Sequence, residues 1–381
     1  MFALRKDTGM SYELNAFSKY FVNDMKHLGR CRWALTIFAL VLLLTILSRT
    51  THIFLFDGGQ GDLGLSSHSA PIKCYDDTTS NKIEDVSDVP PSKDSIFFHE
   101  TSCASAEGDF VFTPRQACAV ESAAKSNPNT DVYVFFLSPI SLKNISLTKN
   151  IAIKTLLSYR NIHLRHVTME WYMQDTPLQG WYKSRVLQRS LWPTSHASDV
   201  MRYLTLWKYS GTYLDLDVVV LKSLSSLRNY AGAESPRAIG AGIINLDSSS
   251  TGRAMAHAFL NELYKSFNGA AWGANGPGVI TRVLRQICQV KTVQDMTPER
   301  CGGFTIHPPI AFYPVSFENW EDYFNEDKSN LTMKMHRDSY IAHLSNKFSI
   351  KKNVTVGSRQ PYGLLAAEHC PKVFSTSQQV F

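Results

Sequence analysis

Two aspartates, Asp215 and Asp217, lie inside the otherwise apolar segment 213–221 (YLDLDVVVL). If this segment is a β-strand, the two side chains point to the same face and lie about 7 Å apart. Two unpaired carboxylates beside an apolar core are costly, and a bound cation would remove that cost. Such oxygen ligands suit Mg²⁺ or Mn²⁺, which in turn bind phosphates. The pattern therefore indicates a divalent-metal site, and the alternative is a loop at a strand end with two solvated aspartates.

A helix expected directly before this segment carries a second pair of charges. Asp199 and Arg202 are three positions apart and share a helical face, while Val200, Leu204 and Trp207 form the packed stripe. A surface ion pair would contribute little to stability. Because the helix runs into the aspartate segment, we expect the pair beside the metal site. Arg202 would then contact phosphate or ribose, and Asp199 would orient it or bind sugar hydroxyls.

From residue 95 onward, the hydrophobic pattern alternates between strands and helices. It predicts strands at 96–98, 132–137, 162–167 and 213–221, and helices at 116–126, 150–159 and 195–209. Continuous apolar strands between helices indicate an α/β domain whose mostly parallel sheet is covered on both faces. Ligands of such sheets bind beyond the carboxyl ends of the strands, so we expect the site there.

The composition is that of a globular protein. The 381 residues are 44% hydrophobic and 19% charged, with a net charge of +6. These values exclude a wholly disordered, collagen-like or polytopic membrane protein. No dense basic stripe is present, which argues against a nucleic-acid partner.

The N-terminal region contains an apolar segment, 33–48, that carries no charge. It reaches the length of a membrane span if Arg49 extends to the interface. Residues 1–32 hold six cations against three acids, so the positive-inside rule keeps them cytosolic. We expect four parts: a cytosolic tail (1–32), a signal-anchor transmembrane segment (33–56), a flexible lumenal stem (57–94) and a globular lumenal domain (95–381).

Two features favour an anchor over a cleaved signal peptide. Thirty-two residues precede the apolar segment, and no small-x-small cleavage site follows it. The short span suits a thin Golgi or early secretory bilayer. Asn144, Asn330 and Asn353 begin N-glycosylation sequons, all on the expected lumenal side.

Six cysteines follow the expected anchor, an even number that could pair in an oxidising compartment: Cys74, Cys103, Cys118, Cys288, Cys301 and Cys370. Short separations favour Cys103–Cys118 and Cys288–Cys301. Free buried thiols are the alternative. The sequence has no C-x-x-C motif, so a zinc ribbon is disfavoured.

The segment 198–224 (SDVMRYLTLWKYSGTYLDLDVVVLKSL) resembles the sugar-binding region of DXD glycosyltransferases. Further segments resemble α1,4-glycosyltransferases of the lactosylceramide 4-α-galactosyltransferase (globotriaosylceramide synthase) family: 99–102, 118–124, 175–178, 181–182, 272–273, 276–277, 311–314 and His343. The resemblance covers about residues 95–372 and includes the expected anchor. It is closest to an invertebrate member of the family.

The resemblance implies a GT-A-type glycosyltransferase fold, a UDP-sugar donor, Mn²⁺ (or Mg²⁺) and retention of anomeric configuration. By the same resemblance, Asp215 and Asp217 hold the metal and the pyrophosphate, and Asp199 and Arg202 contact the donor. His343 is a third metal ligand, or alternatively a packed strand histidine.

The resemblance also gives roles to three polar residues and leaves the sugar pocket open. Thr101 and Ser102 would contact uridine or ribose, and Asn275 would face the reacting sugar, unless it only forms the turn that Asn-Gly-Pro favours. The chain departs from the family pattern at Ser210-Gly211, where paired glycines are usual, and at 239–243 (IGAGI), where an Asn-Gly is expected. No nucleophile or catalytic base is identified.

The sequence thus predicts a retaining hexosyltransferase, single-pass type II in the Golgi membrane. It would move Gal or GalNAc from UDP-Gal or UDP-GalNAc in α1,4 linkage to the terminal sugar of a glycosphingolipid. Two alternatives stay open: a catalytically silent Golgi sugar-binding or partner protein, and a DXD enzyme with another acceptor, similar to N-glycan mannosyltransferases. A phosphatase with an aspartyl nucleophile is disfavoured because the further acidic motif is missing. Association into homo-oligomers, or with other Golgi proteins, is left open.

Overall fold

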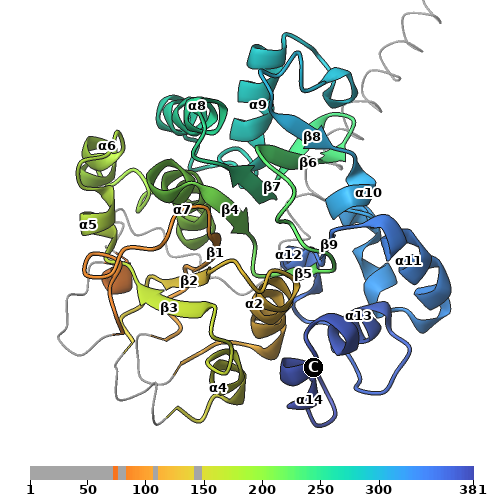
Figure 1. The fold of residues 1–381 in the computed structure, drawn as a ribbon. Helices are drawn as coiled ribbons and strands as arrows, with labels where there is room; N and C mark the ends of the chain where they lie inside the picture. Colours follow the sequence, from red (N-terminus) through yellow and green to blue (C-terminus); the bar gives the residue numbers. More distant parts are fainter. Residues whose placement is uncertain (1–71, 76–82, 106–109, 141–147) are drawn as a thin grey trace, which may run out of the picture. The chain divides into compact units, whose positions relative to one another are not determined.

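The structure, a computed structural model, describes residues 72–75, 83–105, 110–140 and 148–381 (Figure 1). The expected tail, the apolar segment 33–56 and the sequon at Asn144 lie outside these residues. Within them, no helix combines the length and the apolar character needed to cross a bilayer.

Seven strands form one mixed sheet in the order β3-β2-β1-β4-β7-β6-β8. Their bounds are β1 (Ile96–Glu100), β2 (Val132–Phe136), β3 (Ile162–His166), β4 (Gly211–Leu214), β6 (Tyr230–Ser235), β7 (Ala238–Leu246) and β8 (Thr305–His307). The pairs β1–β2, β2–β3, β1–β4 and β6–β8 are parallel, whereas β7 is antiparallel to both β4 and β6. The predicted mostly parallel sheet is confirmed.

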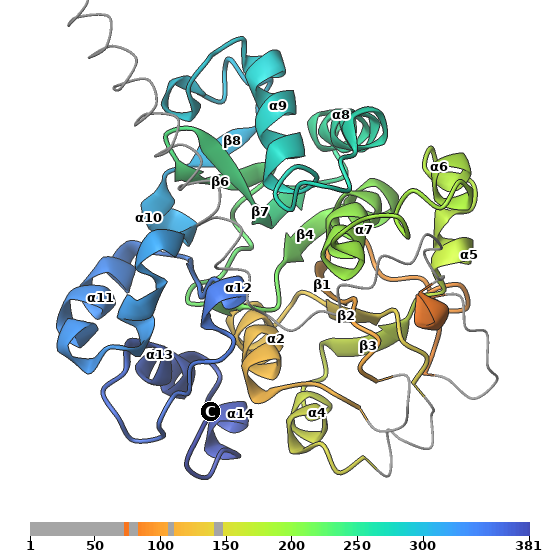
Figure 2. The ribbon, with the colours of Figure 1, turned by 180° about the vertical axis from the view of Figure 1, so that it is seen from behind.

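Helices cover both faces of this sheet (Figures 1 and 2). The α-helices are α2 (Pro114–Ser126), α4 (Ile151–Leu156), α5 (Met169–Met173), α6 (Gln179–Lys183), α7 (Pro193–Tyr209), α8 (Ser250–Ser266), α9 (Pro277–Cys288), α10 (Pro309–Phe312), α11 (Ser329–Met335), α12 (Asn346–Ser349), α13 (Pro361–His369) and α14 (Pro371–Ser375). The 3₁₀ helices are η1 (Lys73–Tyr75), η2 (Val293–Asp295), η3 (Phe317–Phe324), η4 (Glu326–Lys328) and η5 (His336–Asp338).

The alternation of side chains along β1 and β2 divides the core into two halves. Phe97, Tyr133 and Phe135 pack with the helices α7, α8 and α9. Phe98 and Val134, which point the other way, pack with α2, α4 and α13. Every residue of β1 and β2 is buried, as expected for parallel strands covered on both faces. This sandwich leaves the strand ends as the places where polar chemistry can be exposed.

The segment 213–221 is not the single strand predicted. Strand β4 ends at Leu214, and a separate strand, β5 (Val218–Val220), pairs antiparallel with β9 (Ile341–His343) in a two-stranded sheet. Asp215 and Asp217 therefore lie in the turn that connects two sheets. The expectation that they share one face of a continuous strand is wrong. The sequence pattern of an apolar segment is the same whether the segment forms one strand or two strands joined by a turn.

Three disulfides join the cysteines after the expected anchor: Cys74–Cys103, Cys118–Cys370 and Cys288–Cys301. The predicted Cys288–Cys301 pair is confirmed, and the predicted Cys103–Cys118 pair is wrong. Helix α2 packs against the C-terminal helices, which brings Cys118 to a cysteine 252 positions away. Proximity in the sequence does not reveal such a contact.

The described part of the expected stem belongs to the folded domain. Tyr75 is buried and its hydroxyl donates to the carbonyl of Thr101 at 2.6 Å. Asp85 forms a β-bridge with His166, and the two side chains are 2.7 Å apart. The boundary expected between residues 94 and 95 is therefore placed too late, because the Ser-, Asp- and Pro-rich composition hides these few buried side chains.

Candidate metal centre

Three potential metal ligands converge beyond the carboxyl end of β4. Ligand atoms of Asp215, Asp217 and His343 all lie within 4.8 Å of one another. The Nε2 of His343 is 3.7 Å from Asp215 Oδ2 and 3.4 Å from Asp217 Oδ1. The pairing of β5 with β9 sets Val218 opposite His343, which places the imidazole next to the aspartate turn. Residues distant in the sequence thus form one cluster at the predicted edge of the sheet.

Main-chain hydrogen bonds hold the aspartate turn in place. The N–H of Asp215 donates to the carbonyl of Gly242 at 2.9 Å. The carbonyl of Asp217 accepts from the N–H of Leu344 at 2.9 Å, and its Oδ2 accepts from the N–H of Asn346 at 2.6 Å. One oxygen of Asp217 is therefore fixed by the chain after β9, while Oδ1 faces His343.

Arg202 lies buried on α7 and faces the same cluster. Its Nη1 is 3.4 Å from Asp215 Oδ1 and donates to the carbonyl of Ala241 at 2.7 Å. Its Nη2 is 3.1 Å from Asp199 Oδ1, and the guanidinium carbon lies 4.7 Å from the centre of the Tyr213 ring. The pair is not a surface ion pair, and its position beside the aspartates is as expected.

The guanidinium is occupied by protein acceptors. Besides the contacts above, its Nε and Nη2 donate to the carbonyl and hydroxyl of Ser198 at 3.4 and 3.1 Å. The hydrogen bonds of the guanidinium are those to Ala241 and Ser198, and its contacts with the two aspartates are ion pairs. The contact of Arg202 with phosphate or ribose stays a prediction. Arg202 pairs with both Asp215 and Asp199, an arrangement compatible with the orienting role that was one of the two expected for Asp199.

Burial and neighbouring charges shift the protonation of the cluster in opposite directions. Burial works against ionisation of Asp215, yet Arg202 and His343 lower the pKa of this carboxyl to about 2. Burial also works against the His343 cation, but Asp217 and Asp215 raise its pKa to about 9. For Asp199, burial and the charge of Asp215 outweigh Arg202 and raise the pKa to about 7. Without a metal, the aspartates thus stabilise a protonated His343, and a divalent cation would have to displace that proton to use the imidazole as a ligand.

The donor set fits a divalent cation. Two carboxylates and one imidazole offer two hard oxygens and one nitrogen, a combination suited to Mn²⁺ and acceptable to related divalent ions. The hydroxyl of Tyr213 donates to Asp215 Oδ1 at 2.5 Å and so orients the carboxylate from behind. Ligands supported in this way are characteristic of metal centres.

Two further side chains belong to this neighbourhood: Glu234, which lies in no sequence motif, and Tyr313, which lies in the segment 311–314 that resembles the family. Glu234, near the end of β6, packs against Gly240 of β7, and so does the hydroxyl of Tyr313. The Tyr313 ring lies 5.3 Å from the ring of His343. The signal in the sequence was the pair Gly240 and Gly242, which the family pattern marked as a departure.

The other predicted donor-binding residues are Thr101, Ser102 and Asn275, and they differ in whether they lie at the edge of the sheet that carries the metal ligands. Thr101 and Ser102 follow β1 at the same edge of the sheet, where the Thr101 hydroxyl donates to the carbonyl of Thr194 at 3.0 Å and Ser102 binds Glu100. The Asn275 side chain is fully buried, and its amide bonds the N–H and the C=O of Asn268 at 2.8 and 2.9 Å. Asn275 therefore closes its own loop, in line with the alternative expected for it, and its contact with the sugar stays a prediction. Its amide matches a backbone donor and acceptor that burial would otherwise leave unpaired.

The sequons within the described residues are accessible. Asn330, on α11, and Asn353 are both exposed, and Asn330 accepts a hydrogen bond from Arg359 at 3.1 Å.

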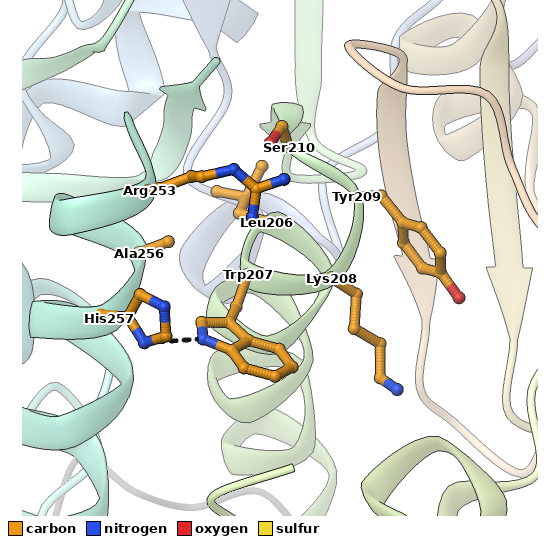
Figure 3. A pocket seen from close by; sticks show the side chains of 8 residues that line it. All are labelled: Leu206, Trp207, Lys208, Tyr209, Ser210, Arg253, Ala256 and His257. Atoms are coloured by element: carbon orange, nitrogen blue, oxygen red, sulfur yellow. Dashed lines mark hydrogen bonds between the residues drawn. The ribbon is translucent and has the colours of Figure 1, made fainter. Parts of the chain in front are cut away.

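A pocket of about 310 Å³ lies elsewhere, between the end of α7 and α8 (Figure 3). It is lined by Leu206, Trp207, Lys208, Tyr209, Ser210, Arg253, Ala256 and His257. The indole of Trp207 donates to the imidazole of His257 at 3.0 Å. Ser210 precedes β4 whereas Asp215 follows it, so this pocket lies at the opposite edge of the sheet from the metal ligands. Ligands of such sheets bind at the carboxyl edge, which favours the aspartate cluster as the functional site.

Comparison with known proteins gives independent evidence about the family of this chain. Residues 113–235 match the family model described as "Glycosyltransferase sugar-binding region containing DXD motif". Residues 248–377 match "Alpha 1,4-glycosyltransferase conserved region". The two matches meet at the site, because the first contains Asp215 and Asp217 and the second contains His343.

Two curated relatives are each 30% identical to this chain. The lactosylceramide 4-alpha-galactosyltransferase of Mus musculus aligns over 277 residues, 73% of this chain and 74% of the relative. The alpha-1,4-N-acetylglucosaminyltransferase of Homo sapiens aligns over 265 residues, 68% of this chain and 74% of the relative. Among solved structures, the PaToxG glycosyltransferase (TM-score 0.37, 12% identity, 77% of this chain and 91% of that one) is weakly similar. So is the galactosyltransferase LgtC with donor and acceptor sugar analogs (TM-score 0.35, 15% identity, 74% and 95%).

Proposed function

The chain belongs to the α1,4-glycosyltransferase family that includes lactosylceramide 4-α-galactosyltransferase, and we propose that it transfers Gal or GalNAc from a UDP-sugar to a glycosphingolipid. The new bond is an α1,4 linkage to the terminal sugar, formed with retention of configuration. The observation that carries the proposal is the convergence of Asp215, Asp217 and His343 within 4.8 Å, with Arg202 behind them. The α/β architecture and the family together support a GT-A-like fold.

The chemical requirement of the reaction matches the charges of this site. Breaking the sugar–phosphate bond leaves negative charge on the departing UDP, and that charge has to be stabilised. A divalent cation, when bound, supplies positive charge to the pyrophosphate. Asp215, Asp217 and His343 would hold that cation. Arg202 keeps Asp215 ionised and fixes its direction, so that this carboxylate would present a charged oxygen to the cation.

The donor sugar is not determined by family membership, because the two relatives above are named for different sugars. Gal and GalNAc remain the proposed pair, and the glycolipid acceptor follows the name of the galactosyltransferase relative. We also propose that the enzyme is a single-pass type II Golgi membrane protein. The uncharged segment at 33–48, the three sequons and the three disulfides support this placement.

The proposal is tested with the full-length chain, purified in detergent with its disulfides intact. UDP-Gal and UDP-GalNAc are offered separately with Mn²⁺ and a ceramide-linked oligosaccharide that ends in β-Gal or β-GalNAc. We expect one donor to give a product whose new linkage is α1,4, and we expect no product after chelation or with Asp217→Asn. If neither donor gives UDP release or product with either acceptor, the proposed substrates are wrong. A product with a β linkage would contradict retention.

A further inference from the structure

Strand β7 carries two glycines on one face, each beneath a group of polar side chains. Gly240 and Gly242 are two positions apart, so a Cβ on either would point to the same side. At Gly242, that Cβ would lie 2.7 Å from Asp215 Oδ2 and 3.1 Å from His343 Nε2. At Gly240, it would lie 2.2 Å from the Tyr313 hydroxyl and 2.9 Å from Glu234 Cγ. The missing side chains therefore make room for two adjacent polar groups.

The spacing of these two groups suits the parts of a nucleotide sugar. Positions two apart on a strand are separated by about 7 Å. In a UDP-sugar the transferred ring is attached directly to the pyrophosphate, so the ring lies one group away from the metal that binds the phosphates. With the metal ligands above Gly242, the next position on the same face is Gly240, where Glu234 and Tyr313 lie.

The fold holds both side chains in this position, although their polar atoms have no hydrogen-bond partner among the described residues. Glu234 lies where the register between β6 and β7 shifts, between Ala233 and Ser235. Bulges of this kind redirect a side chain and are frequent next to active sites. Among the residues that the structure describes, none donates a hydrogen bond to the Glu234 carboxylate. The Tyr313 hydroxyl is buried and also has no hydrogen-bond partner within that part of the chain.

An unpaired buried hydroxyl beside a half-buried carboxylate is unfavourable for stability. Burial is the largest cause that raises the pKa of Glu234. The charges of Asp215 and Asp217 also raise it, whereas those of His343 and Arg202 lower it. A protein keeps such groups when a ligand satisfies them. Sugars offer hydroxyl groups that donate to carboxylates and accept from phenols.

We propose that Glu234 and Tyr313 form the subsite that contacts the transferred sugar of the donor. Glu234 accepts hydrogen bonds from the sugar hydroxyls, and its charge faces the positive charge that develops at the anomeric carbon as UDP departs. Tyr313 donates its hydroxyl to the same ring. This inference rests on the proposed function and adds to it the residues that recognise the sugar.

The experiment compares full-length Glu234→Ala, Glu234→Gln and Tyr313→Phe with the native chain. A matched control is Glu321→Gln, an exposed carboxylate that forms a salt bridge with Lys352. Three quantities are measured: the UDP affinity in Mn²⁺, the kcat/KM for the UDP-sugar, and the thermal midpoint of the metal-free protein. UDP lacks the sugar, so its affinity reports the metal and nucleotide sites alone.

We expect kcat/KM to fall about 10- to 100-fold in Glu234→Ala, the range for a lost charged hydrogen bond in a buried site. Glu234→Gln keeps an acceptor oxygen and should retain more activity, and Tyr313→Phe should lose about 10-fold or less. UDP affinity should stay within about twofold, and the thermal midpoint of Glu234→Gln should not fall, because the substitution removes a carboxylate whose ionisation is disfavoured by burial.

Two results would overturn the inference. One is an unchanged kcat/KM in both Glu234 variants. The other is a parallel loss of UDP affinity and thermal stability, which would mean that Glu234 only supports the fold. If the native chain does not bind UDP in Mn²⁺, the proposed function itself is wrong. If the native chain is active and the Glu234 variants have the same kcat/KM, only this inference is wrong.

Discussion

Replacing Ser210 with glycine should stabilise the protein, although it removes a buried side chain. Ser210 ends α7 with φ 59° and ψ −176°, a backbone conformation that essentially only glycine adopts without strain. Strain of this kind costs about 1–3 kcal/mol, and glycine gives back about 0.4–1 kcal/mol through the larger entropy of the unfolded chain. The small serine side chain contributes little to packing. The expected net gain is about 1 kcal/mol, or about 2 °C in the thermal midpoint of a domain of this size.

The assay is equilibrium urea unfolding of native and variant chains with the disulfides intact, supported by thermal scans. Ser184→Gly is the matched control, because Ser184 also ends a helix but has an ordinary φ of −75°; this variant should lose stability. Gly211→Ala should be strongly destabilising, since the new Cβ would lie 2.3 Å from the carbonyl oxygen of Ser95. If Ser210→Gly lowers the urea midpoint as Ser184→Gly does, the assigned strain is absent.

Three further predictions concern the site and the fold. Gly242→Ala should lower Mn²⁺-dependent turnover about 10- to 100-fold, because the new Cβ would lie 2.7 Å from Asp215 Oδ2; an unchanged Mn²⁺ titration of activity would contradict this. Replacing Cys118 and Cys370 together with serine should cost about 2–5 kcal/mol in urea unfolding, because their disulfide closes 252 positions of chain; an unchanged midpoint would refute it. Burial opposes ionisation of Asp85, but hydrogen bonds from a buried histidine and a serine lower its pKa, so its stabilisation is present above about pH 4 and is lost on acidification. The advantage of the native chain over Asp85→Asn in thermal midpoint should therefore shrink from pH 7 to pH 3, and a constant difference would argue against this role.

The sequence predicted the architecture because apolar periodicity reports burial directly. The alternating strands and helices after residue 95 were confirmed within a few residues. Helix α2 begins two residues earlier than predicted, since Thr113 and Gln116 form a capping box that extends it. The same periodicity could not show the break at Asp215–Asp217, because a strand and a strand with a turn have similar apolar patterns.

The site was only partly predictable. Asp215, Asp217, Asp199 and Arg202 lie close together in the sequence, and local spacing was enough to group them. His343 was assigned to the site only by resemblance, since the β5–β9 pairing that brings it there is a long-range contact. Glu234 lies in no motif, and Tyr313 lies in the segment 311–314, which was marked only by resemblance. The proximity of Glu234 to the metal ligands depends on a shift in strand register and on two glycines. The effect of both can be recognised only in the three-dimensional structure.

The central claim, that Asp215, Asp217 and His343 form a divalent-cation centre which binds UDP, is tested most directly by Mn²⁺ binding. Electron paramagnetic resonance of full-length protein titrated with Mn²⁺, with and without UDP, measures free and bound ion in native, Asp217→Asn and His343→Ala chains. We expect one ion per chain, tighter binding with UDP, and a loss of at least about 10-fold in affinity in each variant. Native-like Mn²⁺ and UDP binding in both variants would contradict the assigned centre.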